Sequence, residues 1–149
     1  MKLLVSAIAL LIGSNVAAMA GDQPLKFKLV TFYVGEKDGG YHMVGVTVAP
    51  DGSLLGTKDF MTKEGPDGKG SGHSTYSFPG GAITADFVFT DDGSQTGGKI
   101  KGTYKILSGT GVYEGATGTG SFDGKWGDHS PLKGAGLYDV ELDVRTPGS

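Results

Sequence analysis

The chain has 149 residues, a formal net charge of −3 and 28 glycines, but no cysteine. A chain of this length forms one ordinary domain, and the lack of cysteine excludes disulfides, thiol nucleophiles and iron–sulfur clusters. The mild acidity and the single arginine, Arg145, argue against nucleic-acid binding, which needs a basic stripe.

The first twenty residues have the three parts of a secretory signal peptide. Met1-Lys2 supplies a positive start, Leu3 to Ile12 is almost continuously apolar, and Ala18-Met19-Ala20 is the small-residue pattern that signal peptidase cuts. The apolar run is too short to span about 30 Å of hydrocarbon, and no later segment is apolar enough, so no membrane span is predicted. We expect cleavage after Ala20, a mature chain of residues 21–149, and a secreted or periplasmic location.

After the signal peptide, apolar residues recur with the period of two that is typical of β-strands. In the first half of the chain the predicted strands cover residues 25–34, 41–48, 53–60 and 73–78. The second of these places Val44, Val46 and Val48 on one face together with His42. Turns are predicted at Gly39-Gly40 and Pro50-Asp51-Gly52, and an exposed loop from Glu64 to Gly72.

The second half continues the same rhythm, with predicted strands at residues 82–90, 99–108, 117–126 and 137–145. The residues from 82 to 90 direct Ile83, Ala85, Phe87 and Phe89 inward. A polar loop from Asp91 to Gly98 follows. The last strand has the clearest alternation, with Tyr138, Val140, Leu142 and Val144 against Asp139, Glu141 and Asp143. This pattern indicates an antiparallel strand with one face in water.

About eight strands separated by glycine and proline turns predict an all-β sandwich or barrel. A barrel is favoured because the glycine-rich strand at 117–126 suits the sharp bending that closure requires. We therefore expect a single antiparallel barrel of about eight strands. The segment from Gly109 to Gly124 has glycine every few residues and predicts a tight corner, with Gly111 or Gly118 at positive φ or against a neighbouring strand.

The segment from Lys101 to Gly118 (KGTYKILSGTGVYEGATG) resembles the core signature of the allene oxide cyclase and dirigent-like barrels. In that family a strand ends in a Gly-x-Gly turn, an aromatic residue follows, and a Gly-Ala/Val-x-Gly step enters the next strand. The chain is also similar to small bacterial secreted proteins of this barrel type. The resemblance implies an eight-stranded antiparallel barrel of lipocalin-like shape, and it brings a cofactor-free cyclase or isomerase into consideration.

Residues that could carry metal or nucleophilic chemistry are few. His42, His73 and His129 are the only histidines and are scattered, so no metal site and no cofactor is predicted. Ser74 follows His73, but neighbouring strand residues point to opposite faces, so the two side chains cannot pair directly. The pair therefore does not predict a serine nucleophile.

The aromatic residues on the predicted strands give the main functional indication. Tyr104, Trp126 and Tyr138 either fill the barrel interior or line a cavity for a small apolar ligand, and Arg145 is the candidate for orienting a polar head group. Glu114 is the candidate acid or base, with an exposed corner residue as the alternative. Arg145 has an alternative as well, a surface ion pair with Asp143 or Glu141.

Two functions of different classes remain open on these residues. The first is an exported barrel that binds a small apolar or amphipathic molecule, or a partner surface, without catalysis. The alternative is a cofactor-free cyclase or isomerase of the allene oxide cyclase type, which works by holding a reactive substrate in a shaped pocket. A packed interior favours a structural or surface-binding role, and a pocket of about 300 Å³ or more with a buried Glu or Tyr favours the enzyme. The oligomeric state is open.

Overall fold

The computed structural model describes residues 24–92, 98–129 and 132–147. The predicted signal peptide, residues 1–20, and most of the predicted loop from Asp91 to Gly98 lie outside these residues. Eight strands and one short 3₁₀ helix, η1 (Gly111–Tyr113), make up the fold. The strands are β1 (Leu25–Lys37), β2 (Gly40–Val48), β3 (Leu54–Glu64), β4 (Lys69–Phe78), β5 (Gly81–Asp91), β6 (Gly98–Gly109), β7 (Thr117–His129) and β8 (Leu132–Arg145).

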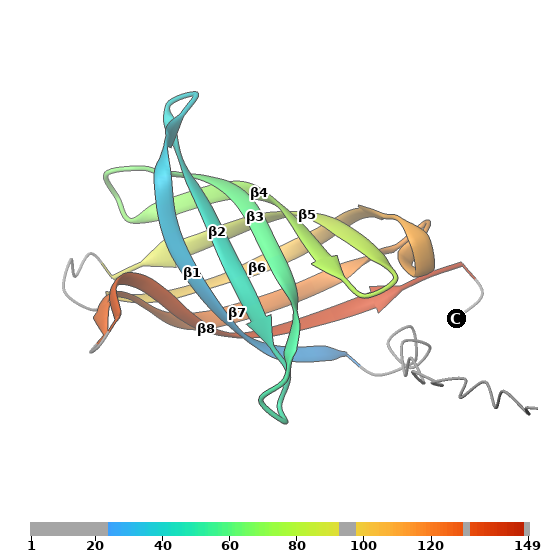
Figure 1. Ribbon diagram of the computed structural model, residues 1–149. Helices are drawn as coiled ribbons and strands as arrows, with labels where there is room; N and C mark the ends of the chain where they lie inside the picture. Colours follow the sequence, from blue (N-terminus) through green and yellow to red (C-terminus); the bar gives the residue numbers. More distant parts are fainter. Residues whose placement is uncertain (1–23, 93–97, 130–131, 148–149) are drawn as a thin grey trace, which may run out of the picture.

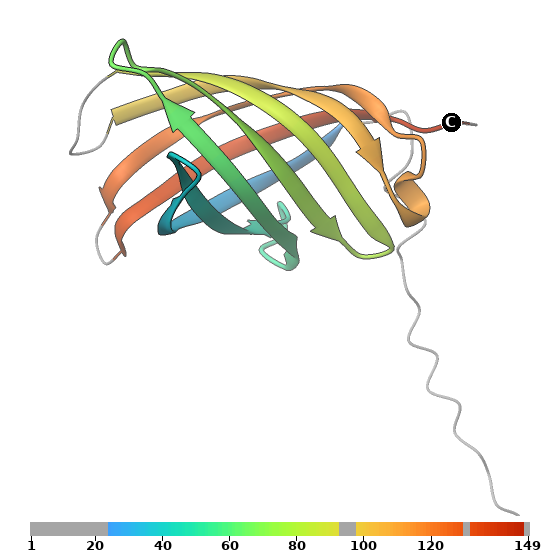
Figure 2. The same cartoon turned by 90° about the horizontal axis from the view of Figure 1, so that it is seen from above.

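Each strand pairs antiparallel with the next, and β1 pairs with β8, so the sheet closes into a barrel (Figures 1 and 2). The predicted all-β, eight-stranded antiparallel barrel is therefore confirmed. The alternation of apolar and polar residues fits this barrel because each strand has one face in the core and the other in water. No helix among the described residues is long and apolar enough to cross a membrane.

The two ends of the barrel differ. The β1–β2 and β3–β4 turns, the last residues of β5 and β7 and the first residues of β6 and β8 lie at one end, which we call the mouth (Figures 1 and 2). The β2–β3 and β4–β5 turns and η1 lie at the other end, which we call the base (Figures 1 and 2). Tyr113 of η1 is fully buried, and its ring centroid lies 6.0 Å from that of Phe78. The base is thus filled with packed side chains.

One sequence-based expectation about the strands needs correction. The loop predicted from Glu64 to Gly72 is confined to the residues between β3 and β4, because Gly70 and Gly72 belong to β4. A Cβ at Gly70 would collide with the ring of Phe89, and one at Gly72 with that of Phe87. These glycines leave room for aromatic rings inside the barrel, although glycine in a sequence usually indicates a loop.

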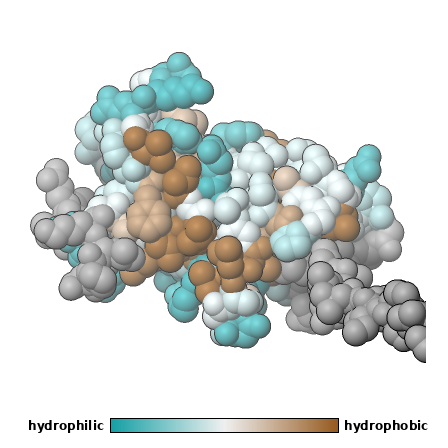
Figure 3. Space-filling view, in the orientation of Figure 1, coloured by the Kyte–Doolittle hydropathy of each residue, from teal (hydrophilic) through white to brown (hydrophobic). Residues whose placement is uncertain are grey.

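The valines of β2 share one face with His42, as predicted. This face is the outer one, while Met43, Gly45 and Thr47 point inward. On the outside, Val44 and Val46 pair with Phe32 and Val30 of β1. Figure 3 shows apolar side chains gathered on this side of the barrel.

The glycine-rich corner between β6 and β7 has the predicted geometry. Gly111 has a φ of 61° and Gly118 a φ of 139°, a region that side chains rarely adopt. A Cβ at Gly111 would collide with the carbonyl oxygen of Gly80, and one at Gly118 with that of Asp143. The corner therefore depends on glycine both for its dihedral angles and for its close packing.

We predict that Gly111→Val and Gly118→Val each lower the free energy of unfolding by about 1–3 kcal/mol, because each combines backbone strain with a collision. Chemical denaturation would measure the change. Gly35→Val is the matched control, since Gly35 has no positive φ and a Cβ at this position would meet no heavy atom within 4 Å. Equal stability of all three variants and the parent would show that the corner tolerates side chains.

Candidate functional site

The barrel interior contains a cavity of about 240 Å³ between its middle and the mouth. Its walls are mostly aromatic, with side chains from β3, β5, β6, β7 and β8: Phe60, Phe87, Phe89, Tyr104, Phe122, Trp126 and Tyr138. Thr31, Lys58, Glu64 and Asp91 are the main polar contributors. An enclosed apolar cavity with few polar groups is the usual form of a small-molecule site.

Cross-strand pairing of glycine with an aromatic residue shapes this cavity. Gly72 pairs with Phe87, Gly102 with Phe122, and Gly124 with Tyr138. In each pair, a Cβ on the glycine would collide with the partner residue. The rings can therefore lie against the wall, which leaves open space along the axis instead of filling it.

Lys58 is the central polar residue of the site. It points inward from β3, between Gly56 and Phe60, and only 3% of its surface is exposed. Its Nζ donates a hydrogen bond to Tyr104 Oη at 2.8 Å. It also lies 4.1 Å from the ring centroid of Phe60 and 4.7 Å from that of Phe87. Among the described residues, Lys58 has no carboxylate partner within ion-pair distance.

These surroundings favour the neutral amine. Burial holds the pKa of Lys58 well below its usual range. The aromatic faces attract a protonated amine by about 2 kcal/mol at a desolvated site. An ammonium ion buried without a counter-ion costs several kcal/mol, so desolvation is the larger effect. The amine therefore keeps a lone pair inside the cavity at a pH where exposed lysines are protonated.

Tyr104 connects Lys58 to a second buried hydroxyl. Tyr76 Oη donates a hydrogen bond to Tyr104 Oη at 2.9 Å, so Tyr104 Oη accepts from both Tyr76 and Lys58. A phenol has two acceptor positions and one O–H donor, so this arrangement leaves the O–H of Tyr104 for a molecule in the cavity. Burial is the main cause that raises the pKa of Tyr104 and of Tyr76, so both keep their protons.

Two carboxylates, Glu64 and Asp91, line the cavity at the mouth. Burial, and next the negative charge of Asp91, raise the pKa of Glu64. Two acidic groups at the opening disfavour an approaching anion. The site thus combines an acidic opening, apolar walls and an amine with a hydroxyl at its inner end.

The structure brings three of the sequence-predicted residues into this cavity, namely Tyr104, Trp126 and Tyr138. The other two lie elsewhere. Arg145 is exposed on β8, with its guanidinium 3.3 Å from the carboxylate of Asp143, which is the surface pair considered as its alternative. Glu114 is exposed beside η1 at the base, which agrees with the alternative of an exposed corner residue.

Sequence reasoning missed Lys58, although a signal was present. Lys58 lies two residues before Phe60, and residues two apart on a strand share a face. An inward Phe60 therefore implies an inward Lys58. The usual expectation that lysine lies in solvent hid this consequence.

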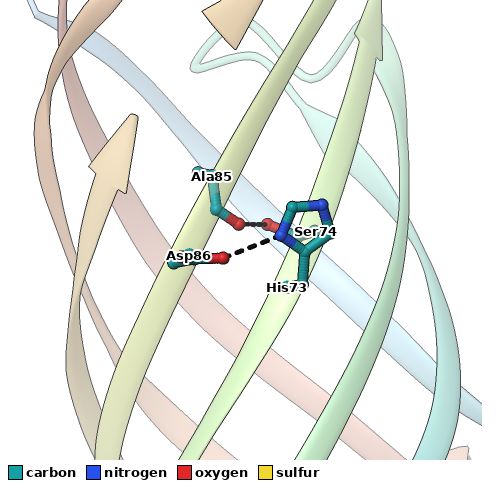
Figure 4. A network of polar contacts seen from close by, with 4 residues as sticks. All are labelled: His73, Ser74, Ala85 and Asp86. Atoms are coloured by element: carbon teal, nitrogen blue, oxygen red, sulfur yellow. Dashed lines mark hydrogen bonds and ion pairs between the residues drawn. The ribbon is translucent and has the colours of Figure 1, made fainter. Parts of the chain in front are cut away.

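His42, His73 and Ser74 do not line the cavity. His73 Nδ1 is 2.7 Å from Asp86 on the outer face, while the Ser74 hydroxyl donates to the carbonyl oxygen of Ala85 inside (Figure 4). His73 and Ser74 thus point to opposite faces, as the strand alternation predicts. His42 Nε2 is 3.0 Å from Asp59. Within residues 24–92, 98–129 and 132–147, no three His, Asp or Glu side chains gather as a metal site would require.

The similar solved structures are dirigent proteins. The pterocarpan synthase dirigent protein GePTS1 superposes with a TM-score of 0.60 at 16% sequence identity, covering 83% of this chain and 92% of that protein. The pterocarpan synthase dirigent protein PsPTS1 gives 0.53 at 14% identity, covering 83% and 96%. The chain has a dirigent-like barrel fold. This likeness establishes the fold alone, since no protein-family model and no curated protein matches the sequence.

We predict that Lys58→Met stabilises the protein at pH 7 by about 1–3 kcal/mol, because the variant no longer buries an amine among apolar side chains. The unfolded chain binds a proton at this amine more readily than the folded one, so the folded state is at a disadvantage below the usual lysine pKa. The advantage of Lys58→Met should shrink by up to about 1.4 kcal/mol per pH unit as pH rises toward 10.

Urea unfolding of the parent and the variant between pH 7 and pH 10 measures this difference. Lys63→Met is the control, because Lys63 lies on the same strand with an exposed side chain. A Lys58→Met variant that is less stable than the parent at every pH would show that the buried amine does not lower the free energy of unfolding.

Proposed function

We propose that this barrel binds a small, mostly apolar, neutral molecule in its interior cavity. The observation that carries the proposal is the aromatic cavity itself, with Lys58 and Tyr104 as polar groups at its inner end. Its volume of about 240 Å³ lies below the roughly 300–1,000 Å³ typical of pockets for drug-sized ligands. The ligand is thus about the size of one aromatic ring with a short side chain.

The acidic mouth supports a neutral ligand. Glu64 and Asp91 flank the opening, and Lys58 lies deeper among aromatic rings. A neutral ligand enters without crossing a repulsive field, and its polar group reaches the Tyr104 hydroxyl. The O–H of Tyr104 favours a hydrogen-bond acceptor on the ligand, such as an ether, alcohol or carbonyl oxygen.

A second candidate function is cofactor-free cyclisation or isomerisation, and the Lys58–Tyr104–Tyr76 chain favours it. A neutral amine can accept a proton and a phenol can donate one, in a cavity that limits water. The solved structures with this fold are named pterocarpan synthases. Glu114 has no part in this candidate, because it lies beside η1 at the base.

We also propose that the chain is exported and matures at Gly21, on the signal-peptide pattern of residues 1–20. Intact-mass measurement of the secreted or periplasmic fraction tests this. The expected species begins at Gly21. A folded pool that keeps Met1 would contradict export with cleavage at this position.

We predict that hydrocinnamyl alcohol, a neutral ring with a short polar tail, changes the fluorescence of Trp126 and raises Tm. Trp126 is the only tryptophan of the chain and lines the cavity, so it reports binding directly. At a concentration a hundredfold above Kd, the bound alcohol should add about 2.7 kcal/mol to the free energy of unfolding.

The matched variants for this titration are on β6. Ile100→Phe places a larger side chain in the cavity and should weaken binding at least about tenfold, whereas Leu107→Phe changes an exposed side chain and should leave binding unchanged. Equal binding by both variants would place the alcohol outside the cavity and refute the proposed site.

A further inference from the structure

The amine of Lys58 goes beyond what reversible binding of an apolar molecule requires. The hydroxyls of Tyr104 and Tyr76 already supply polar contacts at the inner end of the cavity. Burial of an amine on a long flexible side chain adds costs of desolvation and side-chain entropy without an ion pair in return. A nucleophilic role accounts for this amine, because a lysine in an apolar pocket keeps a reactive lone pair.

The neighbours of Lys58 determine which reactant fits. The titratable groups that share its cavity or pack against it are Tyr33, Tyr41, Glu64, Tyr76, Asp91, Tyr104 and Tyr138. The two carboxylates of this set, Glu64 and Asp91, both lie at the mouth. An anionic reactant would meet them first, so a neutral electrophile is favoured over a carboxylate.

The hydrogen bonds around Tyr104 match the needs of a carbonyl group. Tyr104 Oη is 2.8 Å from Lys58 Nζ and accepts a hydrogen bond from Tyr76. Its free O–H can donate to a carbonyl oxygen while the carbonyl carbon faces the lysine nitrogen. The Lys58 amine and the Tyr104 hydroxyl can thus contact the carbon and the oxygen of one C=O bond. The surrounding aromatic rings restrict the access of water to this site.

We propose that Lys58 forms an imine with a small neutral aldehyde or ketone held in this cavity. This inference rests on the proposed binding function and names the chemical class of the ligand. The Nζ lone pair forms a C–N bond to the carbonyl carbon, and the C=O π electrons move to oxygen, which takes the Tyr104 proton. Nζ then returns a proton to Tyr104.

The resulting carbinolamine loses water in the second step. Tyr104 donates a proton to the leaving hydroxyl, the C–O bond breaks to release water, and the C=N bond forms as Nζ gives its second hydrogen to the Tyr104 phenolate. One carbonyl compound and one amine thus yield one imine and one water, with no oxidant or reductant. The imine is neutral, which suits the apolar walls.

Trapping with 2-picoline borane, a neutral reductant that the acidic mouth does not repel, tests the proposal on the mature chain. The protein is incubated at pH 7 with hydrocinnamaldehyde and reductant, and each lysine is scored by peptide mass mapping. We expect one dominant adduct, at Lys58, that adds the mass of the aldehyde less one oxygen. Lys63→Met should keep this adduct, and Lys58→Met should lose it.

Two further measurements separate a reactive lysine from a merely accessible one. On lowering the pH from 10 to 7, an ordinary exposed lysine loses reactivity about tenfold per pH unit, so the ratio of the Lys58 adduct to the Lys63 adduct should rise. Tyr104→Phe should slow adduct formation on the order of a hundredfold, since it removes the proton donor. Adduct ratios that do not change with pH would overturn the proposal.

Binding of hydrocinnamyl alcohol, followed through Trp126, distinguishes the two levels of inference. If the alcohol binds the parent and Lys58→Met, but the aldehyde labels only exposed lysines, the imine is refuted and the binding function stands. If neither the alcohol nor the aldehyde enters the cavity, both the imine proposal and the proposed binding function are refuted. Tighter binding of hydrocinnamate than of the alcohol, dependent on Lys58, would replace the carbonyl ligand with an acid.

Discussion

The structure depends on the pairing of inward glycines with aromatic rings on neighbouring strands. An eight-stranded barrel encloses just enough space for its own side chains, so a cavity requires that some inward positions carry none. Gly72 opposite Phe87 and Gly102 opposite Phe122 satisfy this condition, because each ring occupies the place where a Cβ would lie. The high glycine content is therefore needed in the barrel walls, where the glycines make room for rings, as well as in the turns.

This wall construction also sets the chemical character of the interior. Rings that lie along the wall present their faces to the axis, and Lys58 Nζ lies among the faces of Phe60, Tyr76, Phe87 and Tyr104. Packing at the base, through Tyr113 and Phe78, closes the opposite end from solvent. The amine is consequently held where water cannot solvate its charge, and the fold itself determines its chemistry.

Much of the fold, and part of the site, follows from the sequence. Alternation at residues 83–89 and 138–144 assigns the correct faces, since the inward face is apolar and the outward face is polar except at Val88. On β2 the pattern groups the valines correctly but does not show which face is inward, because valines occupy the outer face and Gly45 and Thr47 the inner one. Periodicity could place Tyr104, Trp126 and Tyr138 inside the barrel. Whether Glu114 and Arg145 lie near the cavity opening depends on which end of the barrel is open, and only the three-dimensional packing shows which end that is.

The packed base has a kinetic consequence. With η1 closing one end, any molecule that reaches Lys58 enters and leaves past the same residues of the mouth, where Tyr33 and Tyr41 lie with ring centroids 6.2 Å apart. A change in these two side chains that does not alter the bound state affects association and dissociation rates by the same factor. The residence time of a ligand can therefore be tuned independently of its affinity, by residues that need not contact it once bound.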